Sequence, residues 1–295
     1  MPDALIRPMT VADLHDAERL SSAAFHEVDR RTFPRSWPEP TPRTPERAQR
    51  WQRRTEHLLR TDPGGCWVAE QDGELVGLAT SLTRELMWIL ASYAVRPDHQ
   101  GRGIGRAVLE AALHHGRGCL RGMFAASADP GAVRRYRLAG FDLHPQMMLT
   151  GVVDRSAIPV VDRVREGTAG DVDLMDSVDR RTRGAAHLGD HDLLLDQFRL
   201  VVTDHSTGSG YAYVDADGSP VLVAATNRRT ASGLMWEALA SSSPGSQVSV
   251  HHITAANAWA LDVGLAARMS IHTNGYLCLR RMKPPAPYLH HGSLL

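Results

Sequence analysis

The sequence is poor in cysteine and carries no excess charge of either sign. Its 295 residues include only 3 cysteines, Cys66, Cys119 and Cys278, which lie far apart. This spacing excludes a disulfide scaffold and a cysteine-based zinc site, and it indicates buried thiols in a reducing compartment. Lys plus Arg and Asp plus Glu each total 33, so no net field draws the chain toward nucleic acid or a membrane surface.

The chain also lacks a long hydrophobic run. Its most apolar stretch, LMWILASYAV at residues 86–95, is too short to span a bilayer. The beginning, MPDALIRPMT, lacks the charged-then-apolar order of a signal peptide. We therefore expect a cytoplasmic protein with no nucleic-acid partner and no membrane partner.

The first half of the sequence alternates between strand-like and helix-like patterns. Residues 5–25 predict a strand and then a helix with Thr10 as its N-cap, and Asp13 completes a capping box. A proline-rich loop over 33–45 leads to a second helix that begins after Thr44. Two alternating apolar runs around Asp72-Gly73 predict a hairpin. The remaining predicted elements are a buried strand at 86–95, a helix at 103–115 capped by Gly116, a strand from 119, a helix from 129 and a final strand from 141.

This order predicts a mixed α/β fold of the α+β type, and not a simple doubly wound sheet. Most neighbouring strands should be antiparallel. The strands on either side of helix 103–115 should form a central parallel pair with a right-handed crossover, flanked by helices.

The second half of the chain repeats the first with weak identity. A second Asp-Gly hairpin lies at Asp217-Gly218, and VSVHHITAANAWALDVGLAARM repeats a strand followed by a helix. The second copy is shorter between its hairpin and its last helix, which we interpret as one missing strand. The predicted domains are 1–152 and 163–285, with a linker at 153–162 and a C-terminal tail at 286–295.

The turn between the buried strand and the following helix is crowded with glycine and arginine. QGRGIG at residues 100–105 fits neither the Walker A nor the Rossmann pattern. Glycines nevertheless let backbone N–H groups approach a ligand closely, and a helix N-terminus favours an anion such as a diphosphate. A tight turn with a solvated basic surface is the plainer alternative.

The surroundings of this turn resemble the acetyl-CoA-binding motif of the GNAT superfamily of N-acetyltransferases. In that motif a strand ending in Val-x-Pro is followed by Gln/Arg-x-x-Gly-x-Gly/Ala and a helix, and Gln100, Gly103 and Gly105 fill those positions. The resemblance covers about residues 4–150. It implies a tandem protein, with a catalytic first GNAT domain and a degenerate second GNAT-like half.

The resemblance also implies the reaction, which is direct transfer of an acetyl group from acetyl-CoA to an amine without a metal. The tyrosine of DPGAVRRYRLAGF, Tyr136, would protonate the leaving thiolate; a plain core residue is the less favoured alternative. A backbone N–H of strand 86–95 would polarise the thioester carbonyl. The backbone at the strand end would pair with the pantetheine arm, and the turn would hold the diphosphate; these cofactor-binding residues are Ala94, Val95, Arg96, Gln100, Gly101, Arg102, Gly103, Ile104, Gly105 and Arg106.

The acceptor side is less defined by the sequence. Some family members use an acidic base in the middle of the buried strand, but Ile89 stands there. The substrate candidates are His26, Glu27, Phe33, Trp37 and Glu85. Residues such as His26, Glu27 and Glu85 are more often plain surface residues. The aromatic pair, Phe33 and Trp37, suits either an apolar acceptor amine or a proline-braced loop.

The second half lacks these groups. Gln100, Gly103 and Gly105 align with Arg228, Ala231 and Gly233, and Tyr136 aligns with Gly264, so no acetyl-CoA site is expected there. Three readings remain open: acetylation of a small-molecule amine, acetylation of a protein or peptide N-terminus, and a non-catalytic acyl-CoA-binding protein. A monomer or a weak homodimer is expected.

Overall fold

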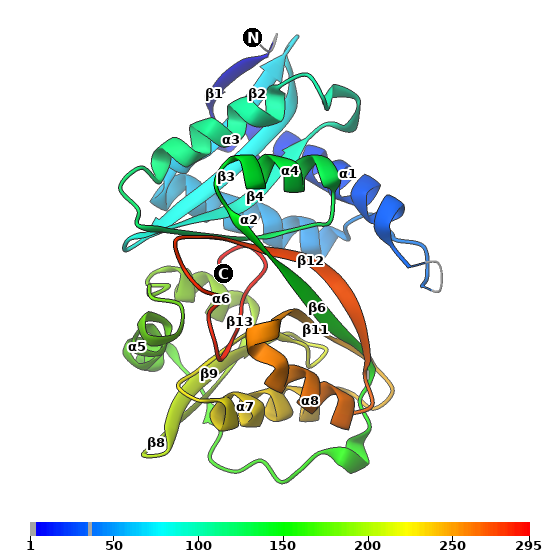
Figure 1. Cartoon of the computed structure of the whole chain (residues 1–295), viewed down its shortest axis with the longest axis vertical. Coiled ribbons are helices and arrows are strands. Elements are labelled where there is room, and N and C mark those ends of the chain that lie inside the picture. Colours follow the sequence, from blue (N-terminus) through cyan, green and yellow to red (C-terminus); the bar gives the residue numbers. More distant parts are fainter. Residues whose placement is uncertain (1–3, 35–36) are drawn as a thin grey trace. The chain divides into compact units, whose positions relative to one another are not determined.

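The computed structural model describes residues 4–34 and 37–295 and divides into two compact units. Unit 1 comprises Met1–Met123 and Ser127–Gly140, and unit 2 comprises Phe124–Ala126 and Phe141–Leu295 (Figure 1). None of the helices within these described stretches is both long and apolar enough to cross a membrane.

Unit 1 contains the elements predicted for the first half of the chain. They are β1 (Leu5–Pro8), α1 (Leu14–Thr32), α2 (Pro45–Thr61), β2 (Cys66–Gln71), β3 (Glu74–Arg84), β4 (Met87–Val95), α3 (Ile104–His115), β5 (Arg121–Ala126) and α4 (Pro130–Leu138). The last three residues of β5 belong to unit 2. Between Thr32 and Pro45 the described residues form no helix or strand, as the proline-rich pattern predicts; Arg35 and Ser36 lie outside the described residues.

The strands of unit 1 follow the order β1-β2-β3-β4-β5. The pairs β1–β2, β2–β3 and β3–β4 are antiparallel, whereas the pair β4–β5 is parallel. This confirms the predicted mixed sheet. Asp72 and Gly73 have φ values of 53° and 79°, as a tight two-residue hairpin requires.

Helices cover both faces of this sheet, with α3 on one face and α1 and α2 on the other (Figure 1). Leu78, Leu82 and Ile89 are fully buried in its core. The predicted caps are confirmed: Asp13 accepts from the Thr10 N–H at 2.8 Å, and Thr44 accepts from the Arg47 N–H. Gly116 ends α3 as predicted, and a Cβ there would lie 2.4 Å from the Trp88 ring.

Unit 2 contains β6 (Asp142–Val152), β7 (Arg165–Glu166), α5 (Val172–Thr182), α6 (Asp190–Gln197), β8 (Arg199–His205), β9 (Gly208–Val214), β10 (Pro220–Ala225), α7 (Arg228–Ala240), β11 (Gln247–Thr254), α8 (Ala258–Ala266), β12 (Ser270–Arg280) and β13 (Tyr288–Leu289). One sheet has the order β7-β8-β9-β10-β13. In the other, β6 lies between β12 and β11 and is antiparallel to both. Leu234, Val250 and Trp259 are among the residues of its buried core.

The two halves of the chain have the same succession of helices and strands, so the missing strand inferred from the sequence was wrong. Each half runs strand, two helices, three strands, helix, strand, helix, strand, and the second half adds β13 at its end. The two Asp-Gly hairpins are not equivalent: Asp72-Gly73 joins β2 to β3, whereas Asp217-Gly218 lies between β9 and β10, which correspond to β3 and β4. Aligning unlike hairpins produced the apparent deficit.

The predicted boundary at residue 152 marks the end of a sequence repeat, and it stays a prediction. The compact units divide differently, because β6 pairs with β11 and β12 of unit 2. The predicted tail 286–295 is an ordered part of unit 2, where β13 pairs with β10 and Leu294 and Leu295 are buried.

Candidate acyl-transfer site

The edge of β4 that faces β5 is paired over only part of its length. The parallel pairs are Met87–Arg121, Trp88–Gly122 and Ile89–Met123, and within the described residues β5 pairs with no later part of β4. Immediately afterwards the register with β3 shifts, so that Ala91 is an extra residue on β4. Such a bulge re-aims the backbone and is common beside active sites. Residues 90–95 thus leave a strand edge open to another hydrogen-bonding chain.

The open edge leads directly into the glycine-rich turn. Gly101 and Gly103 have φ values of 80° and 86°, and a Cβ at either position would meet no atom within 4 Å. Gly103 is the N-cap of α3, and the helical hydrogen bonds begin with Ala107 N–H to Gly103 O. The N–H groups that precede Ala107 are therefore those that a helix N-terminus offers to an anion.

Gly105 serves a different purpose from Gly103. Its Cβ would lie 2.3 Å from the Tyr93 hydroxyl oxygen and 3.2 Å from a methyl carbon of Val95. The glycine therefore allows α3 to pack closely on β4. Ile104 is buried, and its Cγ2 lies close to Gly77 of β3.

The arginines around the turn have different partners. Arg96 pairs with Glu74 at 2.6 Å and with Asp98 at 2.8 Å, and these partners raise the pKa of Arg96. Exposed Arg106 pairs with Glu110 at 2.7 Å. Arg102 donates to the Asp98 carbonyl at 3.1 Å, and in the described part of the chain no carboxylate forms an ion pair with it. Of the three side chains, the guanidinium of Arg102 is the one with charge available for a ligand.

The strand end itself is held in place from both sides. Gln100 donates from its side-chain amide to the Val95 carbonyl at 3.3 Å, and the Arg96 N–H donates to the Val76 carbonyl at 2.9 Å. Ala94 and Val95 are buried and pair with Leu78 and Gly77 of β3. The side chain of Gln100 thus holds the backbone of the strand that it follows.

Tyr136 lies in α4 and is 6 % exposed. Its ring meets that of Tyr93 edge to face, with centroids 5.8 Å apart. Burial raises the pKa of Tyr93 to about 12, although the charge of Arg135 opposes this rise. Sequence reasoning missed Tyr93; its position two residues before the Val-Arg-Pro end of the buried strand was the available signal.

The structure separates the proposed acceptor residues into different surroundings. His26 lies on α1, with a buried Nδ1 that has no hydrogen-bond partner among the described residues. Glu27 pairs with Arg31 one helical turn away at 2.9 Å. Glu85 is exposed in the turn between β3 and β4 with φ 51°, at the end of β4 away from the glycine turn. Phe33 and Trp37 are half-buried beyond the end of α1.

The cysteines offer no activated nucleophile. Cys66 and Cys278 are buried, and Cys119 is half-buried. Burial raises the pKa of Cys66 and of Cys278 to about 12. A thiol of high pKa is mostly protonated at neutral pH and therefore a poor nucleophile.

In unit 2 the corresponding strand edge is covered by the chain itself. β13 pairs with β10 through Val223–Leu289 and Ala224–Tyr288, and the Ala225 N–H donates to the Pro287 carbonyl at 3.3 Å. The helix that follows, α7, begins after Asn227, whose side chain caps it by accepting from the Thr230 N–H at 3.0 Å. Both features that unit 1 leaves open are therefore occupied in unit 2.

The open strand edge, the glycine turn and the helix N-terminus are the features expected of a coenzyme A-dependent acyltransferase. Residues 23–141, less than half of the chain, match the model of the acetyltransferase (GNAT) family. The chain is 36% identical over 88 residues to the mycothiol acetyltransferases of Streptomyces coelicolor and Streptomyces avermitilis. That match covers 28% of this chain and 28% of the Streptomyces coelicolor protein, so the chain spans less than a third of the length of these relatives.

Solved structures resemble the chain over nearly its whole length. A proposed acetyltransferase from Pyrococcus horikoshii superimposes with a TM-score of 0.75 at 19% identity, covering 100% of this chain and 96% of the other. A tandem GNAT protein from the clavulanic acid biosynthesis pathway gives a TM-score of 0.58 at 13% identity, covering 94% and 98%. These likenesses concern the fold, and they confirm the predicted tandem GNAT-like architecture.

Proposed function

We propose that unit 1 transfers an acetyl group from acetyl-CoA to the amine of a small molecule. The observation that carries this proposal is the open edge of β4 over residues 90–95, which ends at the positive-φ glycines before α3. The edge fits the amides of a pantetheine arm, and the turn fits a diphosphate. Acetyl-CoA supplies the activated thioester.

The backbone of unit 1 would hold the cofactor. The N–H groups of residues 102–106 bind the diphosphate, and the guanidinium of Arg102 adds charge. The backbone of Ala94 and Val95 pairs with the pantetheine arm, while Gln100 keeps the Val95 carbonyl in place. Near the bulge at Ala91, a β4 N–H polarises the thioester carbonyl as negative charge develops on its oxygen.

Tyr136 would act as the general acid. The amine nitrogen forms a bond to the carbonyl carbon, the carbon–sulfur bond breaks, and the leaving sulfur takes the phenolic proton of Tyr136. Solvent restores that proton. The proton lost by the amine passes to water, and the step uses neither a cysteine nucleophile nor a metal.

A small acceptor is proposed because the matched relatives are named for mycothiol, a compound and not a protein. His26, Phe33 and Trp37 are the proposed acceptor-side residues, since Glu27 is engaged by Arg31 and Glu85 lies at the far end of β4. A cytoplasmic location and a monomer, or a weak homodimer, complete the proposal.

Calorimetry with acetyl-CoA tests the cofactor site. Wild type and Tyr136→Phe should bind at one site per chain, and Gly103→Glu should not bind. A screen of small amines and peptides with detection of free thiol then tests transfer. Failure of the wild type to bind acetyl-CoA would refute the proposal, and turnover confined to peptides would replace the small acceptor with a peptide.

A further inference from the structure

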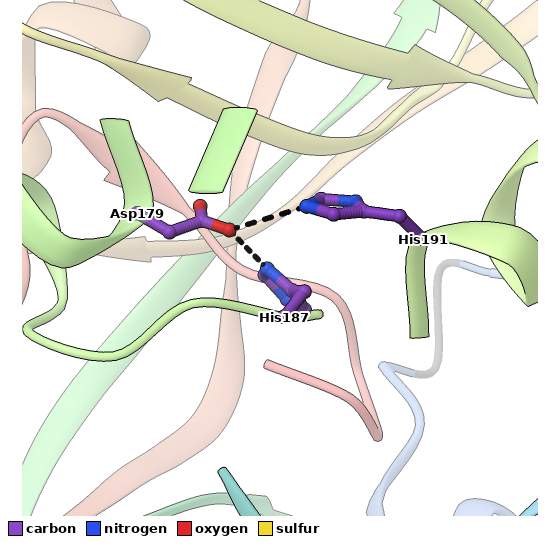
Figure 2. A group of neighbouring side chains, drawn as sticks. All are labelled: Asp179, His187 and His191. Atoms are coloured by element: carbon purple, nitrogen blue, oxygen red, sulfur yellow. Dashed lines mark hydrogen bonds and ion pairs between the residues drawn. The ribbon is translucent and has the colours of Figure 1, made fainter. Parts of the chain in front are cut away.

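Unit 2 contains a cluster of ionisable side chains that lies outside the proposed acyl-transfer site. Asp179 comes from α5, His187 from the turn after it and His191 from α6, and each side chain is 0 % exposed (Figure 2). One ligand atom from each residue lies within 4.8 Å of the others. Sequence reasoning did not single out these residues and predicted no metal, although His187 and His191 have the four-residue spacing of many metal ligands.

Both imidazoles approach the same carboxylate oxygen. Asp179 Oδ2 lies 2.6 Å from His187 Nδ1 and 3.5 Å from His191 Nε2 (Figure 2). His191 Nε2 is also 3.4 Å from Oδ1 of Asp176. Four ligands around a tetrahedral ion with bonds of about 2.1 Å are separated from one another by roughly 3.4 Å. The two separations at His191 are those of ligands that share an ion.

The hydrogen bonds of the cluster leave two buried nitrogens without partners. His187 Nε2 and His191 Nε2 have none among the described residues. His191 Nδ1 is 3.1 Å from the Tyr213 hydroxyl, so when Nδ1 carries the proton, the lone pair of Nε2 faces two carboxylate oxygens. In that tautomer a cation between the three atoms would relieve the repulsion, whereas in the other tautomer the Nε2–H faces the carboxylates.

The cluster carries an excess of negative charge. Asp176 and Asp179 supply two negative charges against the one positive charge of Arg183, whose guanidinium donates to main-chain carbonyls that include Ala185 at 2.8 Å. A bound cation would offset this negative charge.

We propose that Asp179, His187 and His191 form a structural Zn²⁺ site in unit 2, which the carboxylate of Asp176, 3.4 Å from His191 Nε2, would complete. Two imidazoles and two carboxylates suit Zn²⁺, and four protein ligands leave no open position for catalysis. Binding replaces the contact between His187 and Asp179, and their ligand atoms move apart to about 3.4 Å. Tyr211 keeps its hydrogen bond to Asp179 Oδ1, now at 2.5 Å, as an outer partner of the ligand.

The site would join α5 to α6. Asp176 is the most accessible ligand, with 11 % of its side chain exposed, so this carboxylate marks the side from which the ion enters. Because the other ligands are buried, we expect zinc to be incorporated during folding and released slowly. The site is independent of acetyl transfer in unit 1.

Elemental analysis of the full chain tests the proposal. The protein is produced in zinc-supplemented medium and dialysed against a weak chelator. Wild type should retain one zinc per chain, whereas Asp179→Asn and His191→Gln should lose it, with affinity reduced roughly 10–100-fold or more. His205→Gln changes an exposed histidine of β8 and is the matched control that should keep the zinc.

Refolding in Co²⁺ gives a second readout that does not depend on the variants folding. Wild type unfolded in denaturant and refolded with Co²⁺ should show the visible absorption of a tetrahedral ion, which added Zn²⁺ abolishes. Absence of both zinc and this spectrum in wild type would overturn the proposal. So would retention of a full equivalent of zinc by folded His191→Gln, or its loss in His205→Gln.

Discussion

The ring of Tyr136 packs edge to face on the ring of Tyr93, at 5.8 Å between centroids and an angle of 64° between planes. One ring comes from α4 and the other from β4, whose free edge is the proposed pantetheine site. The hydroxyl of Tyr93 packs against Gly105 and leaves no room for a Cβ at that position. We therefore expect the two tyrosines to have different roles: Tyr93 supports the turn, and Tyr136 is the proposed acid.

Replacing Tyr136 by Phe should slow turnover while leaving cofactor binding intact. Loss of a general acid lowers the rate by roughly 10²–10⁴-fold. The measurement is steady-state release of free thiol, with the Kd for acetyl-CoA from calorimetry. Tyr93→Phe is the comparison that tests the assignment: a larger loss of turnover in Tyr93→Phe than in Tyr136→Phe would transfer the acid role to Tyr93.

Gly103→Ala should weaken acetyl-CoA binding by more than its effect on stability explains. The φ of 86° costs an L-residue about 1–2 kcal/mol, and a misdirected amide should raise the Kd at least about tenfold. Gly73→Ala is the matched control, because Gly73 has a φ of 79°, a similarly open surrounding and a place in the β2–β3 hairpin away from the turn. Equal loss of acetyl-CoA affinity in both variants would show that the turn has no specific part in binding.

Gly105→Ala should destabilise unit 1 by overpacking. The new Cβ would approach the Tyr93 hydroxyl oxygen to 2.3 Å, and forced movement of this kind costs about 1–3 kcal/mol. Removing the hydroxyl should relieve part of that cost, so the double variant Gly105→Ala with Tyr93→Phe should have a higher Tm than Gly105→Ala alone. Strict additivity of the two changes in free energy of unfolding would contradict the packing argument.

Unit 2 should lose stability as the pH falls below about 6.5. Burial lowers the pKa of His290 to about 4 and also lowers the pKa of its stacked neighbour His252, 4.2 Å away. The unfolded chain binds these protons first, so the contribution to stability is present above pH 6.5 and is lost progressively as pH falls toward 4. For one such group the loss at pH 5 is about 2 kcal/mol.

Urea denaturation at pH 7.5 and at pH 5.0 measures this effect. His290→Gln should reduce the difference between the two free energies of unfolding, because it removes one of the groups that titrate. His252 remains and should keep part of the pH dependence. An unchanged difference in His290→Gln would exclude His290 as a source.

Local patterns in the sequence were sufficient to predict most elements of unit 1. The caps at Thr10 and Thr44, the Asp72-Gly73 hairpin and the parallel pair around α3 all follow from short-range chemistry. The repeat of unit 2 was misaligned because an Asp-Gly dipeptide reports a tight turn and not which hairpin of the fold contains it. Only the order of the strands resolves that ambiguity.

The site was predictable where the backbone determines it and unpredictable where long-range packing does. Gly103 could be placed from its motif, but the role of Gly105 depends on Tyr93, which belongs to a different element. The convergence of Asp179, His187 and His191 likewise depends on how α6 folds back on α5. Spacing along the chain indicates such a cluster only weakly.

The strand β13 of unit 2 occupies the edge of β10 with which a pantetheine arm would otherwise pair. A tethered strand acts at an effective concentration in the millimolar range, set by the length of chain that connects it. A free acyl-CoA would have to displace this peptide and also remove the Asn227 cap. Exclusion of a cofactor from this edge would therefore require no blocking side chain, because a few residues of main chain already pair with β10.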